Sequence, residues 1–476
     1  MTQLVSEEFA DADLGDPRRV RRLRSIADAV AVEPSAGLPF LMGGEAETEG
    51  LYRFLSNEHV SMEAILAPHF AATAGRLPEE AFIVAHDTTE FRFDKRVGLE
   101  DLGRLREEGS QGFFGHLALA LKEPTNRNPL GLLNLEPLFR TGSPHGRRKR
   151  DSPINEADRW WRGVEAAAER LGNKRRHAIH VMDREADSFT LLWRLLEGEH
   201  RFIVRAAHKN RVVQSEEGFR GVEVQTLEQS LTAVQGKCIR SVDLGRRKAT
   251  GNDTKDRRHP PRQQRVANLR FGARQIFIRR GDYVHGEAAK LLSVNVVDVV
   301  EEDAPHGCEP VRWILFTSEP ISSAADVERI VDGYHSRWLI EDYFKALKTG
   351  CAYEKRQLKS RHALLSALGL FSVIAWRLLV LRAVDRSQPD APATLAFEQH
   401  QLQLINEHRK MRGRPLLRAH PTVREAVAAL AEIGGHLKHN GPPGWLVLGR
   451  AYECLLLMEL GWRAAQANVA KRSCDQ

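Results

Sequence analysis

Two apolar runs that both end in an aspartate constrain the fold of this chain most. A-F-I-V-A-H-D ends at Asp87, and H-A-I-H-V-M-D ends at Asp183. Short apolar runs bounded by turn residues predict buried strands. Carboxylates at the ends of neighbouring strands converge in space, so we expect these two side chains to meet. The simpler alternative is that each aspartate only caps a strand or begins a turn.

The order of predicted elements around these runs indicates an α/β fold. It is strand, strand, strand, helix, strand, helix, strand, over residues 81–87, 116–122, 130–139, 155–171, 177–183, 187–196 and 201–207. This order resembles the ribonuclease H-like fold, a mixed sheet flanked by helices. Residues 208–312 consist of short β-branched pieces between basic loops and predict a β-rich insertion. An apolar strand at 313–317 then returns the chain to the core.

Length and composition indicate a globular protein of several domains. A chain of 476 residues exceeds what one hydrophobic core usually supports, and 42% hydrophobic with 28% charged residues excludes disorder over most of it. We expect an N-terminal helical domain over 1–70, an α/β domain over 71–360 and a helical C-terminal region over 361–476. The apolar run 363–376 is too short to span a bilayer and predicts a buried helix.

Cysteine usage and the N-terminal sequence suggest where the protein works. The five cysteines are odd in number and widely separated, and none forms a C-x2-C pair. We therefore expect reduced thiols, no structural zinc site and a cytoplasmic location. Residues 1–10 show no signal peptide, which agrees with that location.

A cluster of arginines near the N-terminus suggests a polyanionic partner. In L-G-D-P-R-R-V-R-R-L-R, Asp16 can cap a helix that begins at Pro17. The arginines that follow are Arg18, Arg19, Arg21, Arg22 and Arg24. A surface helix usually mixes acids with its bases, so a helix facing DNA phosphates is one interpretation and a solvated helix is the other. The net charge of +7 suits the first.

The stretch from Tyr334 to Lys348 supplies a candidate third carboxylate. At about 100° per residue, Tyr334, Arg337, Glu341, Lys345 and Lys348 share one stripe of a predicted helix, and apolar residues gather opposite. An ordinary amphipathic helix with a solvated charged face gives the same pattern.

Three carboxylates that meet in space favour a divalent cation. Asp87, Asp183 and Glu341 cannot all stay ionised side by side without one. Mg²⁺ or Mn²⁺ suits such oxygen ligands, and sites of this kind hold two ions about 3.5 to 4 Å apart for phosphodiester chemistry. Calcium or a purely structural acid cluster is the alternative.

Several motifs in order resemble one enzyme family. The spacing Y-x2-R-x3-E-x6-K is met by Tyr334, Arg337, Glu341 and Lys348. Further similar blocks are H-D-T-T at 86–89, D-R-E-A-D at 183–187, L-G-D-P-R-R at 14–19, E-G-L-Y-R-F at 49–54, W-I-L-F-T-S-E-P at 313–320 and G-G-x-L at 434–437. Together they resemble bacterial DDE transposases of the insertion-sequence-four family, and most closely the transposon-five type. The resemblance spans nearly the whole chain.

The resemblance implies a function and assigns roles to residues. It implies cut-and-paste transposition, in which Asp87, Asp183 and Glu341 bind two Mg²⁺ or Mn²⁺ ions and DNA ends are cleaved through a hairpin intermediate before joining to target DNA. It also implies a homodimer in the synaptic complex, assembled through the C-terminal helices. The residues implied or expected to contact DNA are Tyr334, Arg337, Lys345, Lys348, Arg205, Trp313, Arg18, Arg19, Arg21 and Arg22.

Some of these assignments keep alternatives. Trp313 matches a position where the family stacks a flipped base, but a tryptophan in an apolar strand also fits a core. Lys345 can equally be solvated. Phe344 stands where the transposon-five type usually has histidine. The basic runs 147–150 and 246–262 are either DNA contacts or solvated loops. The competing functions are a transposase-derived DNA-binding inhibitor without catalysis and a nuclease of the same fold that never joins strands.

Overall fold

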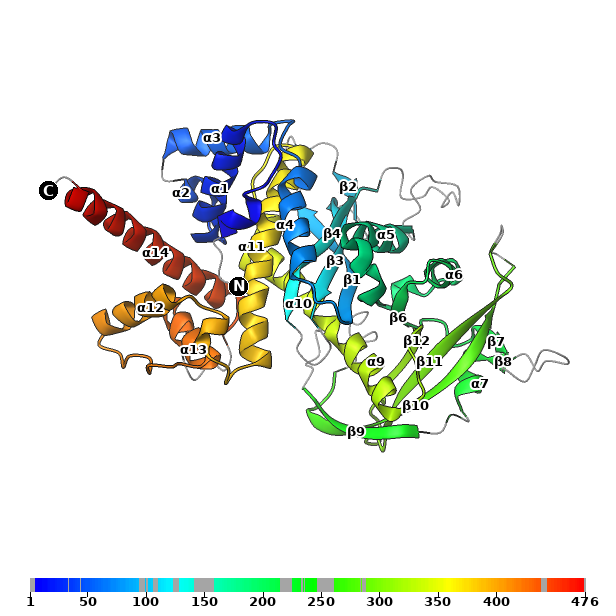
Figure 1. Ribbon diagram of the computed structural model, residues 1–476. Helices are drawn as coiled ribbons and strands as arrows, with labels where there is room; N and C mark the ends of the chain where they lie inside the picture. The colour runs from blue at the N-terminus through cyan, green and yellow to red at the C-terminus, as the bar shows by residue number, and fades with distance from the viewer. Residues whose placement is uncertain are drawn as a thin grey trace.

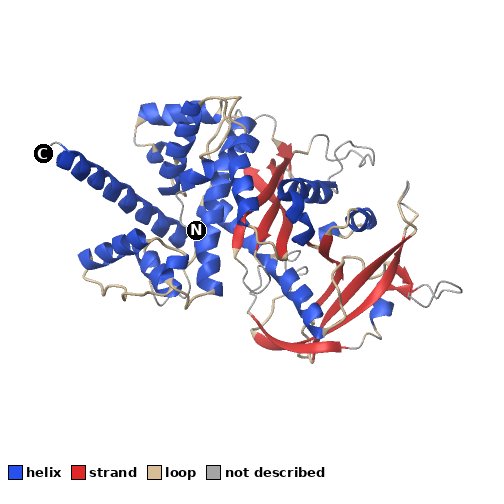
Figure 2. Ribbon diagram, viewed as in Figure 1, coloured by secondary structure: helices blue, strands red, loops and turns tan. Residues whose placement is uncertain are grey.

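The computed structural model shows helices gathered on one side and a long sheet on the other (Figure 1, Figure 2). Secondary structure is described for residues 5–32, 34–42, 44–93, 99, 102–105, 110–122, 128–140, 158–214, 225–232, 234, 236–245, 261–282, 284, 288–437 and 443–474. The predicted basic run 147–150 and residues 246–260 of the predicted basic run 246–262 lie outside these residues.

The N-terminal part is helical, as predicted. Its elements are η1 (Val5–Phe9), α1 (Pro17–Val32), α2 (Leu38–Leu41), α3 (Glu45–Leu55) and α4 (Met62–Arg76). The predicted cap of α1 is present, because the Arg18 amide donates to Asp16 Oδ1 at 2.7 Å. Leu23, Ile26 and Ala27 of α1 are buried and form an apolar seam on this helix.

A mixed sheet forms the centre of the protein. Its first strands are β1 (Phe82–Phe93), β2 (Gly103–Arg104), β3 (Gln111–Leu121), β4 (Pro129–Leu138), β5 (Ala178–Met182) and β6 (Arg201–Arg205). β1 pairs antiparallel with β3, and β3 pairs antiparallel with β4. β1 pairs parallel with β5, and β5 with β6. Helices α5 (Arg159–Leu171) and α6 (Phe189–Glu197) supply the crossover connections that parallel pairing requires.

The predicted insertion extends the same sheet. Its elements are β7 (Val212–Gln214), β8 (Gln225–Thr226), α7 (Leu227–Leu231), β9 (Gly236–Leu244), β10 (Arg265–Arg279) and β11 (Leu291–Glu302). The return strand β12 (Arg312–Thr317) lies between β6 and β11 and pairs antiparallel with both. The insertion is therefore continuous with the central sheet through backbone hydrogen bonds.

The C-terminal region is helical, and its first helix packs against both the N-terminal helices and the other C-terminal helices. The elements are α11 (Arg361–Ser387), α12 (Gln399–Met411), α13 (Val423–Ile433) and α14 (Trp445–Cys474). In Figure 1, α11 stands between the sheet and the other C-terminal helices. α11 is long and apolar enough to cross a membrane, but 94% of its most apolar stretch of 18 residues is buried inside the protein.

The structure corrects three predicted boundaries. The apolar run 363–376 belongs to a helix of 27 residues, so burial, not shortness, argues against a membrane span. α11 also continues past this run to Ser387, well beyond its predicted end at residue 376. Asp87 lies inside β1 and not at its end, because antiparallel pairing with β3 continues to Phe93. The four cysteines described, Cys238, Cys308, Cys351 and Cys454, are free, as expected.

A buried polar cluster joins the N-terminal helices to the sheet and to α11. Glu8 accepts hydrogen bonds from His69 Nδ1 at 2.6 Å and from Arg76 Nη1 at 2.5 Å. His69 Nε2 accepts from the Leu132 amide at 3.1 Å, so Nδ1 must carry the proton of a neutral imidazole. The Arg76 guanidinium lies over the Trp376 ring of α11.

This cluster makes the stability of the protein depend on pH in the acid range. Burial alone raises the pKa of Glu8, but the hydrogen bonds from His69 and Arg76 outweigh it and lower that pKa to about 2. Because the folded pKa lies below the ordinary value of 4.5, the stabilisation is complete above about pH 4.5 and is lost as the pH falls through about 2.

We predict that Glu8→Gln lowers the free energy of unfolding near pH 6 by about 2 to 3 kcal/mol, and that this difference from wild type shrinks towards about pH 3. Denaturant unfolding at the two pH values measures it. Glu7→Gln, at the exposed neighbouring position, is the control and should change little. A Glu8→Gln difference that does not depend on pH would contradict the ionised carboxylate.

Candidate active site

The register of the two parallel strands places Asp87 beside Asp183. Ala85 of β1 pairs with Val181 of β5, so the chain positions two residues later on each strand are Asp87 and Asp183. Asp183 follows the end of β5 and caps the short helix η4 (Arg184–Ala186). Beyond this pair β1 continues along β3, whereas β5 ends at Met182. The two aspartates lie close enough for the Asp183 carboxylate to add to the raised pKa of Asp87, as the predicted convergence requires.

Glu341 approaches this point from a helix that is not continuous with the preceding one. The sequence predicts one helix over 334–348, but the structure has α9 (Ala324–Ser336), then a break at Arg337, then α10 (Trp338–Lys345). The turn η5 (Ala346–Gly350) has π-type hydrogen bonding. The two helices therefore do not present the single charged stripe that a continuous helix predicts. Tyr334 and Arg337, which the helical wheel placed on that stripe, are buried.

Arg337 connects two of the three predicted acids. Its Nη1 donates to Asp87 Oδ2 at 2.8 Å, and its Nη2 donates to Glu341 Oε1 at 3.2 Å. The Arg337 side chain is 9% exposed, while those of Asp87 and Glu341 are 18% and 31% exposed. The guanidinium is thus enclosed, and the two carboxylates keep part of their surface open to solvent.

The charges around Arg337 perturb one another. Burial raises the pKa of Asp87 to about 6; Arg337 opposes this rise and the nearby Asp183 carboxylate adds to it. Burial also raises the pKa of Glu341 against the effect of Arg337. Burial disfavours the charge of Arg337, but Asp87, Tyr334, Asp183 and Glu341 outweigh it and raise its pKa. The three acids and Arg337 therefore act on each other as one electrostatic cluster.

The donor chemistry of this cluster fits a hard divalent cation. Carboxylate oxygens are the ligands that Mg²⁺ and Mn²⁺ prefer. In their present arrangement, though, the described side chains include no group of three or more carboxylates, imidazoles or thiolates placed to hold a metal ion. The positive charge between Asp87 and Glu341 is instead the Arg337 guanidinium.

A second arginine, which sequence reasoning missed, ties the two aspartates together indirectly. The Thr88 amide donates to Asp87 Oδ1 at 2.7 Å, and the Glu185 amide donates to Asp183 Oδ1 at 2.8 Å. Arg159, at the start of α5, donates from Nε to Thr88 Oγ1 at 2.9 Å and from Nη2 to Glu185 Oε2 at 2.6 Å. Arg159 thus links the two residues whose amides hold the carboxylates.

Beneath the two aspartates lies a layer of buried histidines. His86 Nε2 lies 2.9 Å from His180 Nδ1 across β1 and β5, and His116 Nδ1 lies 3.0 Å from Thr88 Oγ1. Burial lowers the pKa of all three, so they are neutral at physiological pH. Gly163 of α5 permits the close packing, because a Cβ there would lie 2.6 Å from His116 Nε2.

The other residues predicted to contact DNA surround the acids at different depths. Tyr334 is buried and its ring packs edge-on against Trp313, with centroids 5.3 Å apart. Lys348 Nζ donates to the Glu90 carbonyl oxygen and lies 3.6 Å from Glu354, so it is not in contact with the acids. Lys345 is half exposed and forms an ion pair with Asp342 at 3.4 Å.

Three further residues of this region differ in how exposed they are. Arg205 lies at the end of β6 and is partly exposed. Phe344, the position that departs from the family pattern, is buried and therefore offers no surface to DNA. Trp338, which follows Arg337 directly, is 55% exposed, and sequence analysis gave it no role. Tryptophan in an amphipathic helix usually faces the core, so the sequence carried no signal for its exposure.

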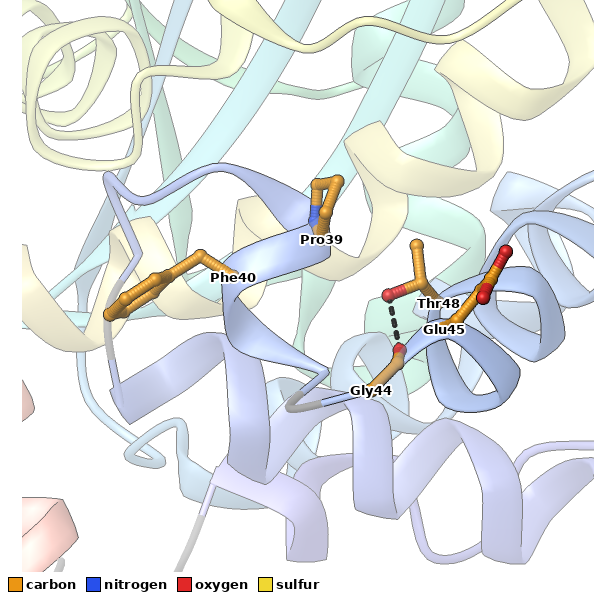
Figure 3. Close-up of a pocket in the computed structure, with 5 residues that line it drawn as sticks. All are labelled: Pro39, Phe40, Gly44, Glu45 and Thr48. Carbon is orange, nitrogen blue, oxygen red and sulfur yellow. Dashed lines mark hydrogen bonds between the residues drawn. The ribbon is translucent and has the colours of Figure 1, made fainter.

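The arginines of α1 divide into two kinds. Arg18, Arg21, Arg22 and Arg24 are exposed. Arg19 is partly buried and donates to the Leu14 carbonyl oxygen at 2.7 Å, so it stabilises the start of the helix. In the same domain, a shallow pocket is lined by Pro39, Phe40, Gly44, Glu45 and Thr48 (Figure 3). It contains none of the predicted site residues.

We predict energetic coupling between Arg159 and Glu185. In a double-mutant cycle of Arg159→Met and Glu185→Ala, the interaction energy should be about 1 kcal/mol, above the 0.3 to 0.5 kcal/mol found for independent sites. Denaturant unfolding of the four proteins measures it. The control cycle combines Arg159→Met with Glu165→Ala in place of Glu185→Ala. Glu165 is an exposed acid on α5, the helix of Arg159, and this cycle should be additive. Additivity in the first cycle would show that Arg159 does not tie the two strands.

Two family models match segments that contain the arginine helix and two of the three acids. Residues 1–60 match the family described as transposase DNA-binding, and residues 141–376 match the family described as transposase DDE domain. The second match contains Asp183 and Glu341, whereas Asp87 precedes it. The two matched segments together span more than half of the chain. The chain is therefore a transposase with an N-terminal DNA-binding domain and a DDE catalytic domain, an enzyme that cleaves and transfers DNA strands.

Proposed function

We propose that this protein is a cut-and-paste transposase of the insertion-sequence-four family, similar to the transposon-five type, and that Asp87, Asp183 and Glu341 are its catalytic acids. The observation that carries this proposal is the register of β1 and β5, which sets Asp87 beside Asp183, with Glu341 joined to Asp87 through Arg337. The motifs around all three acids agree with that family.

The topology supports a ribonuclease H-like core. The strand order β4, β3, β1, β5, β6, with two antiparallel pairings followed by two parallel ones, is the mixed sheet that this fold requires. The helices α5 and α6 form the crossovers. In such open sheets the site lies at the carboxyl ends of the parallel strands, which is where Asp183 follows β5.

We infer that the three acids hold divalent cations, Mg²⁺ or Mn²⁺, during catalysis. Bound there, the ions supply activation of the attacking oxygen and stabilisation of the leaving oxygen. For Asp87 and Glu341 to share a cation, their hydrogen bonds with Arg337 must break. Nη1 and Nη2 of Arg337 are then available to bind a phosphate. The phosphate-holding role implied for Arg337 is therefore compatible with its position between the acids.

The proposed reactions reuse one site. Water attacks the phosphorus at the transposon end, the P–O3′ bond breaks and a 3′ hydroxyl is released. That hydroxyl attacks the opposite strand and forms a hairpin; hydrolysis reopens it, and the same hydroxyl then attacks target DNA. In each step one P–O bond forms and one breaks, and the proton leaves the attacking oxygen. Arg337 orients the phosphate. Lys348, whose Nζ donates to the Glu90 carbonyl oxygen, supplies a second positive charge for the DNA backbone.

The exposed side chains near the acids suit a DNA substrate with a displaced base. Trp338 offers an open aromatic surface beside Arg337, and Trp313 lies partly exposed against Tyr334. Stacking of a base on an aromatic side chain is worth about 1 to 3 kcal/mol. The exposed arginines of α1 provide the binding of the transposon ends. We further propose that the C-terminal helices pair two copies in the synaptic complex.

We predict that Asp87→Asn, Asp183→Asn and Glu341→Gln each reduce Mg²⁺-dependent cleavage of transposon-end DNA by more than about 100-fold, because even changes behind metal ligands cost 10 to 100-fold. Each variant keeps the shape of the side chain and removes its charge. End binding, measured by gel shift, should survive.

Glu328→Gln is the matched control, since Glu328 lies on α9 and pairs with Arg240, away from the acids. Its cleavage should equal that of wild type. Cleavage retained by any of the three acid variants would remove that residue from the site. Cleavage by wild type without hairpin-ended or joined products would favour a nuclease, and end binding without any cleavage would favour a DNA-binding inhibitor.

A further inference from the structure

The connection between α12 and α13 is an exposed turn with a high density of positive charge. Residues 408–424 contain six lysines or arginines and no aspartate or glutamate. From Lys410 to His420 every residue is exposed except Leu417, which is half-buried. The family models matched by this chain end before this segment.

The turn has a defined conformation. Gly413 has a φ of +62°, a value that favours glycine, and its amide donates to the Lys410 carbonyl oxygen at 3.0 Å. The Arg414 amide donates to the Arg409 carbonyl oxygen at 2.8 Å. Arg409 Nε donates in turn to the Pro415 carbonyl oxygen at 2.7 Å. The backbone is thus fixed where the charges are displayed.

Neighbouring acids neutralise the edges of the turn but not its centre. Arg409 pairs with Glu432 at 2.7 Å, and Arg418 pairs with Glu425 at 2.7 Å. In the part of the chain that the structure describes, no carboxylate pairs with the side chains of Lys410, Arg412 or Arg414. These three side chains form what we call the basic turn.

Two large apolar side chains accompany the basic turn. Met411 is 76% exposed and Leu416 is 57% exposed. A surface that only kept the protein soluble would mix acids with these bases, because like charges repel one another at this density. A fixed, uncompensated cationic turn with apolar neighbours has the features of a surface that binds a polyanion.

We propose that the basic turn, Lys410, Arg412 and Arg414, binds the phosphate backbone of duplex DNA outside the segment that is cut. The proposal adds a DNA contact to the protein's established DNA binding and does not depend on which residues are catalytic. In Figure 1, α12 and α13 lie across α11 from the sheet, so the turn that joins them is separated by α11 from the strands β1 and β5. The DNA it touches must therefore extend beyond the cleavage site.

Duplex DNA is the occupant that the structure favours. Guanidinium and ammonium groups on a fixed backbone match phosphate oxygens, and the chain already carries a matched DNA-binding segment. In Figure 1, α1 lies on the same side of α11 as α12 and α13, so the exposed arginines of α1 and the basic turn are on one side of the sheet.

The test is the salt dependence of binding to a long duplex of random sequence. In full-length protein, the triple variant Lys410→Gln, Arg412→Gln, Arg414→Gln removes three positive charges. Each phosphate contact contributes about 0.9 to the slope of log K against log salt, so we expect the slope to fall by about 2 to 3. The midpoint of thermal unfolding should not change, because the three side chains are exposed and unpaired.

The matched control is Lys209→Gln, Arg329→Gln, Arg418→Gln, which removes the same charge from exposed side chains that already have acid partners. Its slope should stay close to that of wild type. An unchanged slope in the first variant, or equal loss in both, would overturn the proposal. So would an altered oligomeric state with DNA binding intact, which would assign the turn to a protein partner. The slope is measured on a random duplex that is not cut, whereas the catalytic assignment is measured by cleavage of transposon-end DNA, so the two proposals can fail separately.

Discussion

The parallel pairing of β1 with β5 is the constraint on which the site depends. Four register pairs, from Phe82 with Ala178 to Ala85 with Val181, fix the two strands before either carboxylate is reached. Two residues later, Asp87 and Asp183 must lie side by side at the end of the paired segment. Two carboxylates in such a position repel one another and require a cation. In this structure the Arg337 guanidinium lies between Asp87 and Glu341, and Asp183 also contributes to its raised pKa. Arg337 is also the residue at which α9 ends and α10 begins.

Several contacts around this point connect it to the rest of the fold. Arg159 joins the residues that hold the two aspartates, and neutral histidines fill the space beneath them. β12, paired to β6, leads directly into α9 and so sets the direction from which Arg337 and Glu341 arrive. On the other side, α11 packs against α4 and the sheet, and the Glu8, His69 and Arg76 cluster fixes the N-terminal helices to it. The transposase thus anchors the acids through hydrogen bonds to the sheet and α5, and it carries exposed basic residues on the helical side.

Much of this arrangement could be predicted from local sequence. The alternation of apolar runs and helical segments predicted each central strand, although β1 continues six residues past Asp87 and β3 begins five residues before its predicted start. The two apolar runs that end in aspartate predicted that Asp87 and Asp183 lie close together. The residues that could not be predicted act through tertiary contacts. Arg159 has no sequence signal, because its partners, Thr88 and Glu185, lie 71 and 26 residues away. The helix break at Arg337 was missed because a helical wheel assumes continuous α-helical geometry, whereas burial between Asp87 and Glu341 determines where this side chain lies. The length of α11 was underestimated, since Arg377 and Arg382 interrupt the apolar run without ending the helix.

The central claim is that Asp87, Asp183 and Glu341 bind divalent cations at one site, and that these cations replace the Arg337 guanidinium between the acids. The most direct measurement is a crystal structure of the protein with transposon-end DNA and Mn²⁺, with anomalous diffraction recorded to locate the manganese. The account predicts anomalous density bounded by the three carboxylates, with Arg337 released from Asp87 and bound to a DNA phosphate. Manganese located elsewhere, or Arg337 still joined to both Asp87 and Glu341 beside bound DNA, would contradict it.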